Sequence, residues 1–203
     1  MKKTKLSRAD RRKAIVETAA QLFAEVGFRG GTTRELAKRV GVTEPVLYEH
    51  FQTKSDLYSA IIDDSSRDSF EEGRAILEKK AAAGDPVDFF STLAKLIADH
   101  QTKHPNFLRL VLFSALEKHE LAQLCFERHA IVIHQMVTRF IKERIAGGVF
   151  RPVDAPLVAR SFMGMVMHYV IFDQHFGFKL VRSSQKRAID SMVDIFLTGL
   201  KSE

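Results

Sequence analysis

A chain of 203 residues, 45% of them hydrophobic, is long enough to bury one or two cores, so we expect a compact soluble protein. It has no run of about 18 uncharged apolar residues, and its basic start leads into more charge, which argues against a membrane span or a signal peptide and for the cytoplasm. The single cysteine, Cys125, excludes an internal disulfide and a cysteine-based zinc site, and we expect an inert core thiol.

The positive charge is concentrated near the start of the chain. Residues 1–58 contain 12 Lys and Arg against 7 Asp and Glu, whereas the remaining 145 residues carry a net charge of only +1. Clustered cations are typical of proteins that bind polyanions, because the release of condensed counterions drives association. A basic segment that is simply solvated is the alternative interpretation of the same charge.

Four helix start signals occur within the first sixty residues. A first helix is predicted over residues 8–26, with Gly27 just beyond its end, and short helices follow over about 32–40 and 44–51. A fourth helix begins at about Thr53. Three starts have the spacing of a capping box, in which two side chains bond reciprocally to the free N–H groups of the first turn. These pairs are Ser7 with Asp10, Thr32 with Glu35, and Thr53 with Asp56.

The helical period continues through the rest of the chain in longer elements. Helices are predicted over about 86–104, 107–116, 120–145, 155–176 and 184–200, and the last two are rich in apolar residues. No strand-like alternation or internal repeat interrupts them. The sequence therefore predicts an all-α fold of about nine helices.

Residues 32–51 fit the description of a helix-turn-helix motif. Two short helices flank a turn at Gly41-Val42, and Thr43 is placed to cap the second helix, whose first turn accommodates Pro45. A second helix held at this angle can enter the major groove of DNA, which is wide enough for one helix. The sequence therefore indicates a DNA-binding unit.

The residue strings of this region raise the specificity of that interpretation. They read TTRELA from Thr32, GVT from Gly41 and LYEHFQTKSDL from Leu47. Over about residues 8–62 these strings resemble the TetR family of bacterial regulators. The resemblance implies a homodimer built on the last two helices, which binds a palindromic operator in double-stranded DNA and is released by a small-molecule effector. It also implies a DNA-binding domain over 1–62 and a ligand-binding and dimerisation domain over 63–203, in a cytoplasmic protein associated with the nucleoid.

The resemblance also assigns DNA contacts to individual residues. It implies phosphate contacts from Thr33, Tyr48, His50 and Lys54, and it places Arg34, Glu44, Pro45 and Val46 near base edges with Thr43 beside them. Two alternatives stay open. Tyr48 could be a half-buried core ring, and Glu44 could either accept a hydrogen bond from a cytosine amino group or only complement the dipole of its helix. Leu47 and Phe51 are expected in the core.

The second half supplies apolar surface and few polar groups. We expect an effector that is largely apolar, in a cavity among about residues 86–176, and the candidate contacts are Phe89, Phe90, His100, Phe107, Met165, His168, Tyr169 and Phe172. In the last helix, Met192 and Phe196 are expected at the subunit interface. His100 and His104 have the i,i+4 spacing of a metal pair, but no companion ligand follows, so neither a metal nor a cofactor is expected.

Three functions compete at this point. The leading hypothesis is a ligand-responsive regulator, in the first place a repressor, with activation as the alternative sign. The second is a nonspecific architectural protein of the nucleoid, which would use the same basic unit without reading bases. The third is an enzyme with a vestigial DNA-binding corner, and it lacks a sequence basis because no nucleophile, base or phosphate-binding motif occurs. No catalytic residue is therefore predicted.

Overall fold

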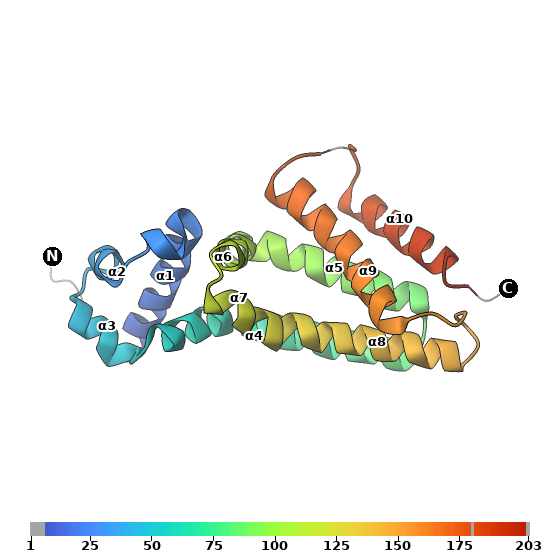
Figure 1. Cartoon of the computed structure of the whole chain (residues 1–203), viewed down its shortest axis with the longest axis horizontal. Coiled ribbons are helices and arrows are strands. Elements are labelled where there is room, and N and C mark those ends of the chain that lie inside the picture. Colours follow the sequence, from blue (N-terminus) through green and yellow to red (C-terminus); the bar gives the residue numbers. More distant parts are fainter. Residues whose placement is uncertain (1–6, 180, 202–203) are drawn as a thin grey trace. The chain divides into compact units, whose positions relative to one another are not determined.

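The structure of the chain is a computed structural model that describes residues 7–179 and 181–201. Its helices, shown in Figure 1, are α1 (Arg8–Gly30), α2 (Thr33–Val40), α3 (Glu44–His50), α4 (Lys54–Ala83), α5 (Pro86–Lys103), α6 (Pro105–Leu116), α7 (Glu120–Cys125), α8 (Ile131–Ala146), α9 (Ala155–Tyr169) and α10 (Gln185–Thr198). Two π-helical segments, η1 (Phe126–Ala130) and η2 (Val170–His175), join α7 to α8 and extend α9. The all-α prediction is confirmed.

The helix starts follow the predicted capping signals at all but one position. At all three predicted capping boxes the N-cap oxygen accepts from the N–H three residues later, at 3.1 Å for Ser7, Thr32 and Thr53. The reciprocal bond is present at Thr53, whose N–H donates to Asp56 Oδ2 at 2.8 Å, so this is the complete capping box of the three. Thr43 occupies the N-cap of α3 in extended geometry, but its side chain makes no capping hydrogen bond. Thr43 is therefore the N-cap residue, as predicted, but it lacks the side-chain hydrogen bond of a cap, and it lies on the exposed surface of the motif.

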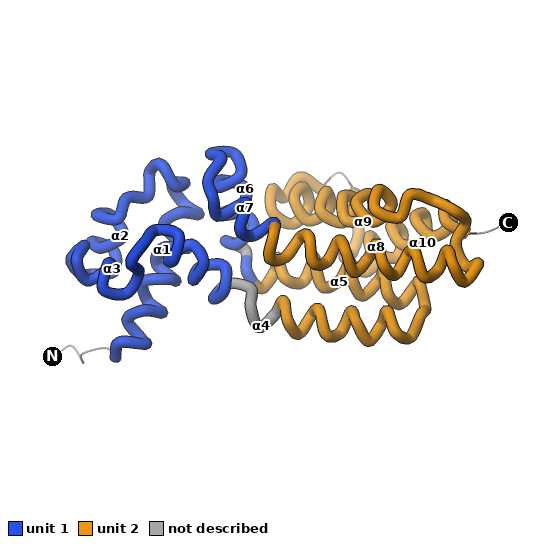
Figure 2. Tube along the Cα trace, turned by 60° about the horizontal axis from the view of Figure 1, so that its bottom comes forward, with its two compact units in different colours: residues 1–68, 104–126 blue, residues 69–103, 127–203 orange. Residues whose placement is uncertain are grey.

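The chain packs into two compact units, coloured separately in Figure 2. Unit 1 comprises α1 to α3, the first part of α4, and α6 with α7, whereas unit 2 comprises the rest of α4, α5, and the chain from Glu127 onward. The predicted functional boundary after residue 62 stays a prediction. The packing adds one fact that the linear sequence did not suggest, namely that residues 104–126 fold with the N-terminal helices.

The core of unit 1 is a single apolar cluster drawn from six helices. Its fully or almost fully buried members include Ile15, Leu22, Leu36, Leu47, Ile61, Leu110 and Leu121. Phe51 is buried with them, so the core placement predicted for Leu47 and Phe51 is confirmed. Cys125 lies at the edge of this cluster, and burial raises the pKa of its thiol to about 11. A thiol with that pKa stays protonated near neutral pH and is a poor nucleophile, as expected.

The end of α1 is held by a carboxylate from the end of α6. Gly27 has a φ of 72°, which breaks the regular helix where the sequence predicted its end, and a further helical turn then runs to Gly30. The backbone N–H groups of Phe28 and Arg29 both donate to Glu117 Oε2, each at 3.0 Å. Because the left-handed conformation favours glycine, Gly27 allows the kink that presents both N–H groups to one oxygen.

Aromatic contacts reinforce the same junction. The Phe28 ring stacks on the His119 imidazole with centroids 4.0 Å apart, and Tyr58 approaches that imidazole edge-on at 4.4 Å. His119 Nδ1 accepts a hydrogen bond from the N–H of Leu121 and so caps α7. Burial lowers the pKa of His119, which favours the neutral imidazole that this acceptor role requires.

Unit 2 is built around stacked phenylalanines. Phe89 stacks on Phe140 with centroids 3.9 Å apart, and Phe90 meets Phe162 at 4.7 Å and Phe196 at 4.9 Å. Phe196, which was expected at a subunit interface, is half-buried beside this aromatic core, and its place at an interface stays a prediction. A well-packed aromatic core of this kind holds α5, α8, α9 and α10 together.

We predict that Glu117→Ala destabilises unit 1 by about 1–3 kcal/mol, because two backbone N–H groups lose a charged acceptor. Amide hydrogen exchange at Phe28 and Arg29 should accelerate, and chemical denaturation should report the loss of stability. Glu117→Gln keeps an acceptor oxygen and should lose less. Glu72→Ala removes an exposed carboxylate from α4 and serves as the control. Equal effects of the Glu117 and Glu72 variants would contradict the assignment.

Candidate nucleic-acid interface

The turn between α2 and α3 depends on one glycine. Gly41 has a φ of 78°, and its N–H donates to Ala37 O at 2.9 Å while the N–H of Val42 donates to the same oxygen at 2.9 Å. This left-handed residue ends α2 abruptly and lets the chain turn into α3. Leu36 and Leu47 are buried on the two sides of the turn, which fixes the rotation of both helices about their axes. The remaining face of α3 is left toward solvent.

Most of the predicted DNA contacts lie on the exposed part of this motif. Arg34, Thr43, Pro45, Tyr48 and Lys54 are exposed, and Thr33, Glu44, Val46 and His50 are half-buried. Tyr48 is 47% exposed, so the alternative interpretation of this residue as a core ring is wrong. The nine side chains come from α2, α3, the N-cap of α3 and the first turn of α4. Their assignment as DNA contacts stays a prediction.

Three of the predicted phosphate contacts meet at one place. Thr33 of α2, Tyr48 of α3 and Lys54 of α4 line the same narrow crevice, whose floor is formed by core residues such as Leu47. Its volume of about 20 Å³ has room for roughly one water-sized group. The lining itself is almost entirely apolar, and the Thr33 hydroxyl already donates its hydrogen to Glu44, so the donors that remain here for a phosphate oxygen are the Tyr48 hydroxyl and the Lys54 ammonium.

Glu44 is tied to α2. The hydroxyl of Thr33 donates to Glu44 Oε2 at 2.9 Å, and this bond joins the first turns of the two helices of the motif. This bond uses one oxygen of the Glu44 carboxylate. The other oxygen can accept a hydrogen bond from a base, or the negative charge can interact favourably with the N-terminal dipole of α3. Both sequence interpretations of Glu44 are therefore compatible with this arrangement.

The structure adds cations that the motif-based assignment missed. Burial, together with the positive charges of Arg8 and Arg11, lowers the pKa of His50, and the Arg12 guanidinium lies 4.4 Å from the centroid of the Phe51 ring. The first turn of α1 therefore stands beside the last turn of α3. These arginines were counted in the charge of residues 1–58, but only the tertiary fold brings them to the end of the predicted recognition helix.

The predicted effector contacts are spread over different environments. Phe89 and Phe90 are fully buried in the aromatic core of unit 2, whereas Phe107 belongs to unit 1 and packs against its core. His168 and Phe172 stack on each other with centroids 4.5 Å apart at the exposed side of the α9 and η2 rod. The half-buried members of the set are His100, Met165 and Tyr169. This set stays a prediction, and a ligand that touched all eight residues would have to reach both units.

Comparison with known proteins decides the family. Residues 15–61 match the family model of bacterial regulatory proteins, tetR family, and residues 89–199 match that of the C-terminal domain of AefR-like transcriptional repressors. The chain belongs to the tetR family of transcriptional regulators. Members of this family are regulators rather than enzymes, and the resemblance seen in the sequence is confirmed.

Relatives of this tetR-family chain include proteins of distinct roles. The nucleoid occlusion factor SlmA of Aliivibrio fischeri is 27% identical over 163 residues, covering 77% of this chain and 80% of the relative. The tetracycline repressor protein class C of Escherichia coli is 48% identical over 50 residues, which are 25% of this chain and 23% of the relative. The crystal structure of AibR with isovaleryl coenzyme A and operator DNA is similar with a TM-score of 0.68 and 26% identity, covering 91% of this chain and 97% of AibR.

We predict that Lys54→Ala weakens binding to every DNA sequence and lowers the log–log salt slope by about one unit, because one phosphate contact is lost. Fluorescence anisotropy across a salt series measures both quantities. Lys95→Ala removes an exposed lysine from α5 in unit 2 and is the matched control. An altered base preference with an unchanged salt slope would show that Lys54 reads bases and does not contact phosphate.

Proposed function

We propose that this tetR-family regulator is a ligand-responsive repressor that binds a palindromic operator as a homodimer in the bacterial cytoplasm. The observation that carries the proposal is the motif surface, where Thr33, Tyr48 and Lys54 converge on one crevice beside the exposed start of α3. Phosphate contacts there would position α3 on the duplex. Arg34 and the segment 44–46 would then read base edges in the major groove.

A second candidate function follows from the likeness to SlmA, a nucleoid occlusion factor, over three quarters of the chain. A protein of that kind would also bind DNA through α2 and α3. The two candidates differ in what the binding serves, and the sequence hypothesis of a nonspecific architectural protein differs from both in how well it discriminates sites.

In-vitro site selection should therefore yield a palindrome that the protein binds about 10³-fold or more tightly than a scrambled duplex of equal length. The palindrome follows from the two-fold symmetry of the proposed dimer, which separates the recognition helices by about 34–36 Å, one turn of DNA. Binding that fails to distinguish the selected from the scrambled duplex would favour the architectural role. Selected sites that occur in promoters favour a repressor over a nucleoid occlusion factor.

The dimer is supported by apolar surface that a single chain leaves uncovered. Helix α9 and η2 together, Ala155–His175, contain an 18-residue window with a mean hydropathy of 1.3, long and apolar enough to cross a membrane, yet only 28% of that window is buried within the chain. Arg160 and Asp173 interrupt the Ala155–His175 segment with charge. Leu157 of α9 is 58% exposed and Ile195 of α10 is 66% exposed. The two helices lie side by side (Figure 1), and two such pairs could form an isologous four-helix contact.

We predict that Ile195→Glu and Leu157→Glu each convert the dimer to monomers that no longer bind operator, because each places a charge in the apolar contact. Sedimentation at micromolar concentration and operator binding are the two measurements. These positions are better probes than Phe196, because its half-buried ring also contacts Phe90 and Phe162, so a charge there would disturb the fold as well. Val87→Glu changes an equally exposed apolar residue, at 58%, on α5 and should leave a dimer. A wild-type chain that sediments as a monomer would exclude this arrangement.

The proposed effector acts through helix α4, which belongs partly to the DNA-binding unit and partly to unit 2. AibR was crystallised with both isovaleryl coenzyme A and operator DNA, so a small-molecule effector is a reasonable expectation for this chain as well. Helix α4 begins four residues after α3 ends, and the chain passes from unit 1 to unit 2 within it. A ligand bound in unit 2 that favours one tilt of α4 would move α3. By linkage, a hundredfold loss of DNA affinity, a coupling of about 3 kcal/mol, requires an equal loss of effector affinity in the DNA complex.

A further inference from the structure

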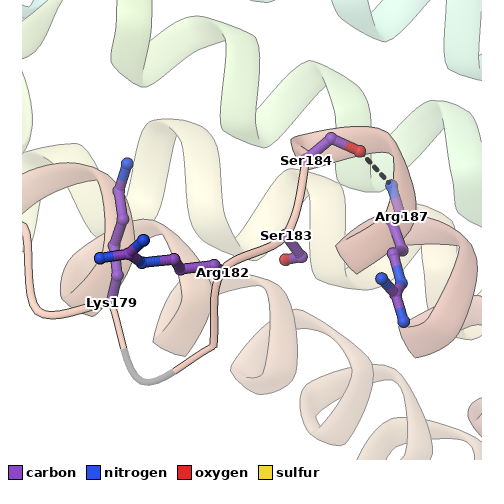
Figure 3. Close-up of a pocket in the computed structure, with 5 residues that line it drawn as sticks. All are labelled: Lys179, Arg182, Ser183, Ser184 and Arg187. Carbon is purple, nitrogen blue, oxygen red and sulfur yellow. Dashed lines mark hydrogen bonds between the residues drawn. The ribbon is translucent and has the colours of Figure 1, made fainter.

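Unit 2 contains a hollow whose lining is strongly basic. It is an open depression on the surface, where the loop after η2 meets the first turn of α10, with a volume of about 540 Å³ and a lining of exposed residues. Lys179, Arg182, Ser183, Ser184 and Arg187 line it. Figure 3 shows Lys179 and Arg182 together on the loop, with Arg187 on the first turn of α10 and the two serines between them. We call this feature the basic hollow.

The three cations of the basic hollow are not neutralised by acidic side chains. Within the described part of the chain, no carboxylate lies within 4.0 Å of Lys179, Arg182 or Arg187. Their neighbour Lys186 differs, because its Nζ lies 2.6 Å from Asp190 Oδ2. Elsewhere in unit 2, Lys80 pairs with Asp88 in the same way. Three like charges around one hollow repel one another, so this arrangement favours an anion that fills it.

The backbone adds to the positive potential. Helix α10 starts at this hollow, its first turn holds no acidic residue, and the Ser184 hydroxyl accepts from the N–H of Arg187 at 3.2 Å. The N-terminus of a helix carries a partial positive charge that favours anions. The Ser183 hydroxyl provides a further neutral donor at the lining.

A hydrogen-bonded chain of polar groups fixes the start of α10. Gln185 Nε2 donates to Asp99 Oδ1 of α5 at 2.7 Å, and Gln174 Nε2 of η2 donates to Gln185 Oε1 at 2.9 Å. These bonds tie Gln185, the first residue of α10, to α5 and η2. They also engage one oxygen of the Asp99 carboxylate. The start of α10 is therefore held in place by its neighbours, so this side of the hollow is partly preorganised for a ligand.

We propose that the basic hollow binds the phosphate groups of a small-molecule ligand. Two guanidinium groups can each bind a phosphate in bidentate fashion, the lysine adds a point charge, and hydroxyls and helix N–H groups complete the donors. Three positive charges match a diphosphate better than a single carboxylate. This site is independent of operator recognition, which is assigned to unit 1.

Calorimetric titration of inorganic pyrophosphate into the full-length chain tests the proposal. The double variant Arg182→Gln with Arg187→Gln should weaken binding by about tenfold or more, because each lost charge-assisted bond contributes roughly that factor. Lys186→Gln removes the same charge from the same turn, but its ammonium is paired with Asp190, and its binding should change less than about twofold. Arg182→Lys with Arg187→Lys keeps the charge and should restore part of the affinity.

Several outcomes would overturn this assignment. Absence of pyrophosphate binding at millimolar concentration, or equal losses in the double variant and in Lys186→Gln, would leave only diffuse surface charge. Binding of anionic phospholipid vesicles that the double variant abolishes would assign the cations to a lipid surface. A loss of operator affinity in the double variant, with pyrophosphate binding unchanged, would assign them to DNA. Unchanged operator affinity in a variant that loses pyrophosphate is the expected result, and it tests this site separately from the repressor function.

Discussion

The burial of Leu36 and Leu47 on either side of the Gly41 turn is the constraint on which the DNA-binding surface depends. Helix α3 has only seven residues, too few to be stable alone, so its orientation comes from this anchoring. With Leu47 directed into the core, Tyr48 lies on the exposed side and Thr33 comes within 2.9 Å of Glu44. The convergence of Thr33, Tyr48 and Lys54 on one crevice is a consequence of the same packing.

A second constraint is the distribution of the chain between the two units. The chain crosses from one unit to the other within α4, between α5 and α6, and at the start of η1. Helix α6 ends in Glu117, which holds the kink of α1, and α7 begins at the His119 cap that stacks on Phe28. Helices far along the sequence thus complete the unit that carries the DNA-binding motif. Any signal from a ligand in unit 2 has three covalent routes to it, and α4 leads most directly to α3.

The two candidate ligand surfaces both present cations to an anion, but they arrange these cations differently. On the motif, the cations of α1 and α4 are arranged with hydroxyls around the exposed start and end of a short helix, which suits an extended polyanion. In the basic hollow, three exposed cations line one open surface depression at the start of α10, which suits a compact anion. The net charge of +1 beyond residue 58 conceals this cluster, because ion pairs such as Lys186 with Asp190 balance the charge elsewhere.

The sequence by itself determined the local structure, the family and the position of the motif. These features depend on residues only a few positions apart, so they can be predicted from the sequence alone. Examples are the capping pair of Thr53 with Asp56, the glycine at position 41 and the helical period. Tertiary packing decided which side chains meet. The Phe196 ring contacts Phe90 and Phe162, Phe107 packs in unit 1, and Lys179, Arg182 and Arg187 lie together beside the start of α10. An apolar residue at helical spacing can face the core, a partner or a ligand, and only the competition among all helices for buried surface chooses between them.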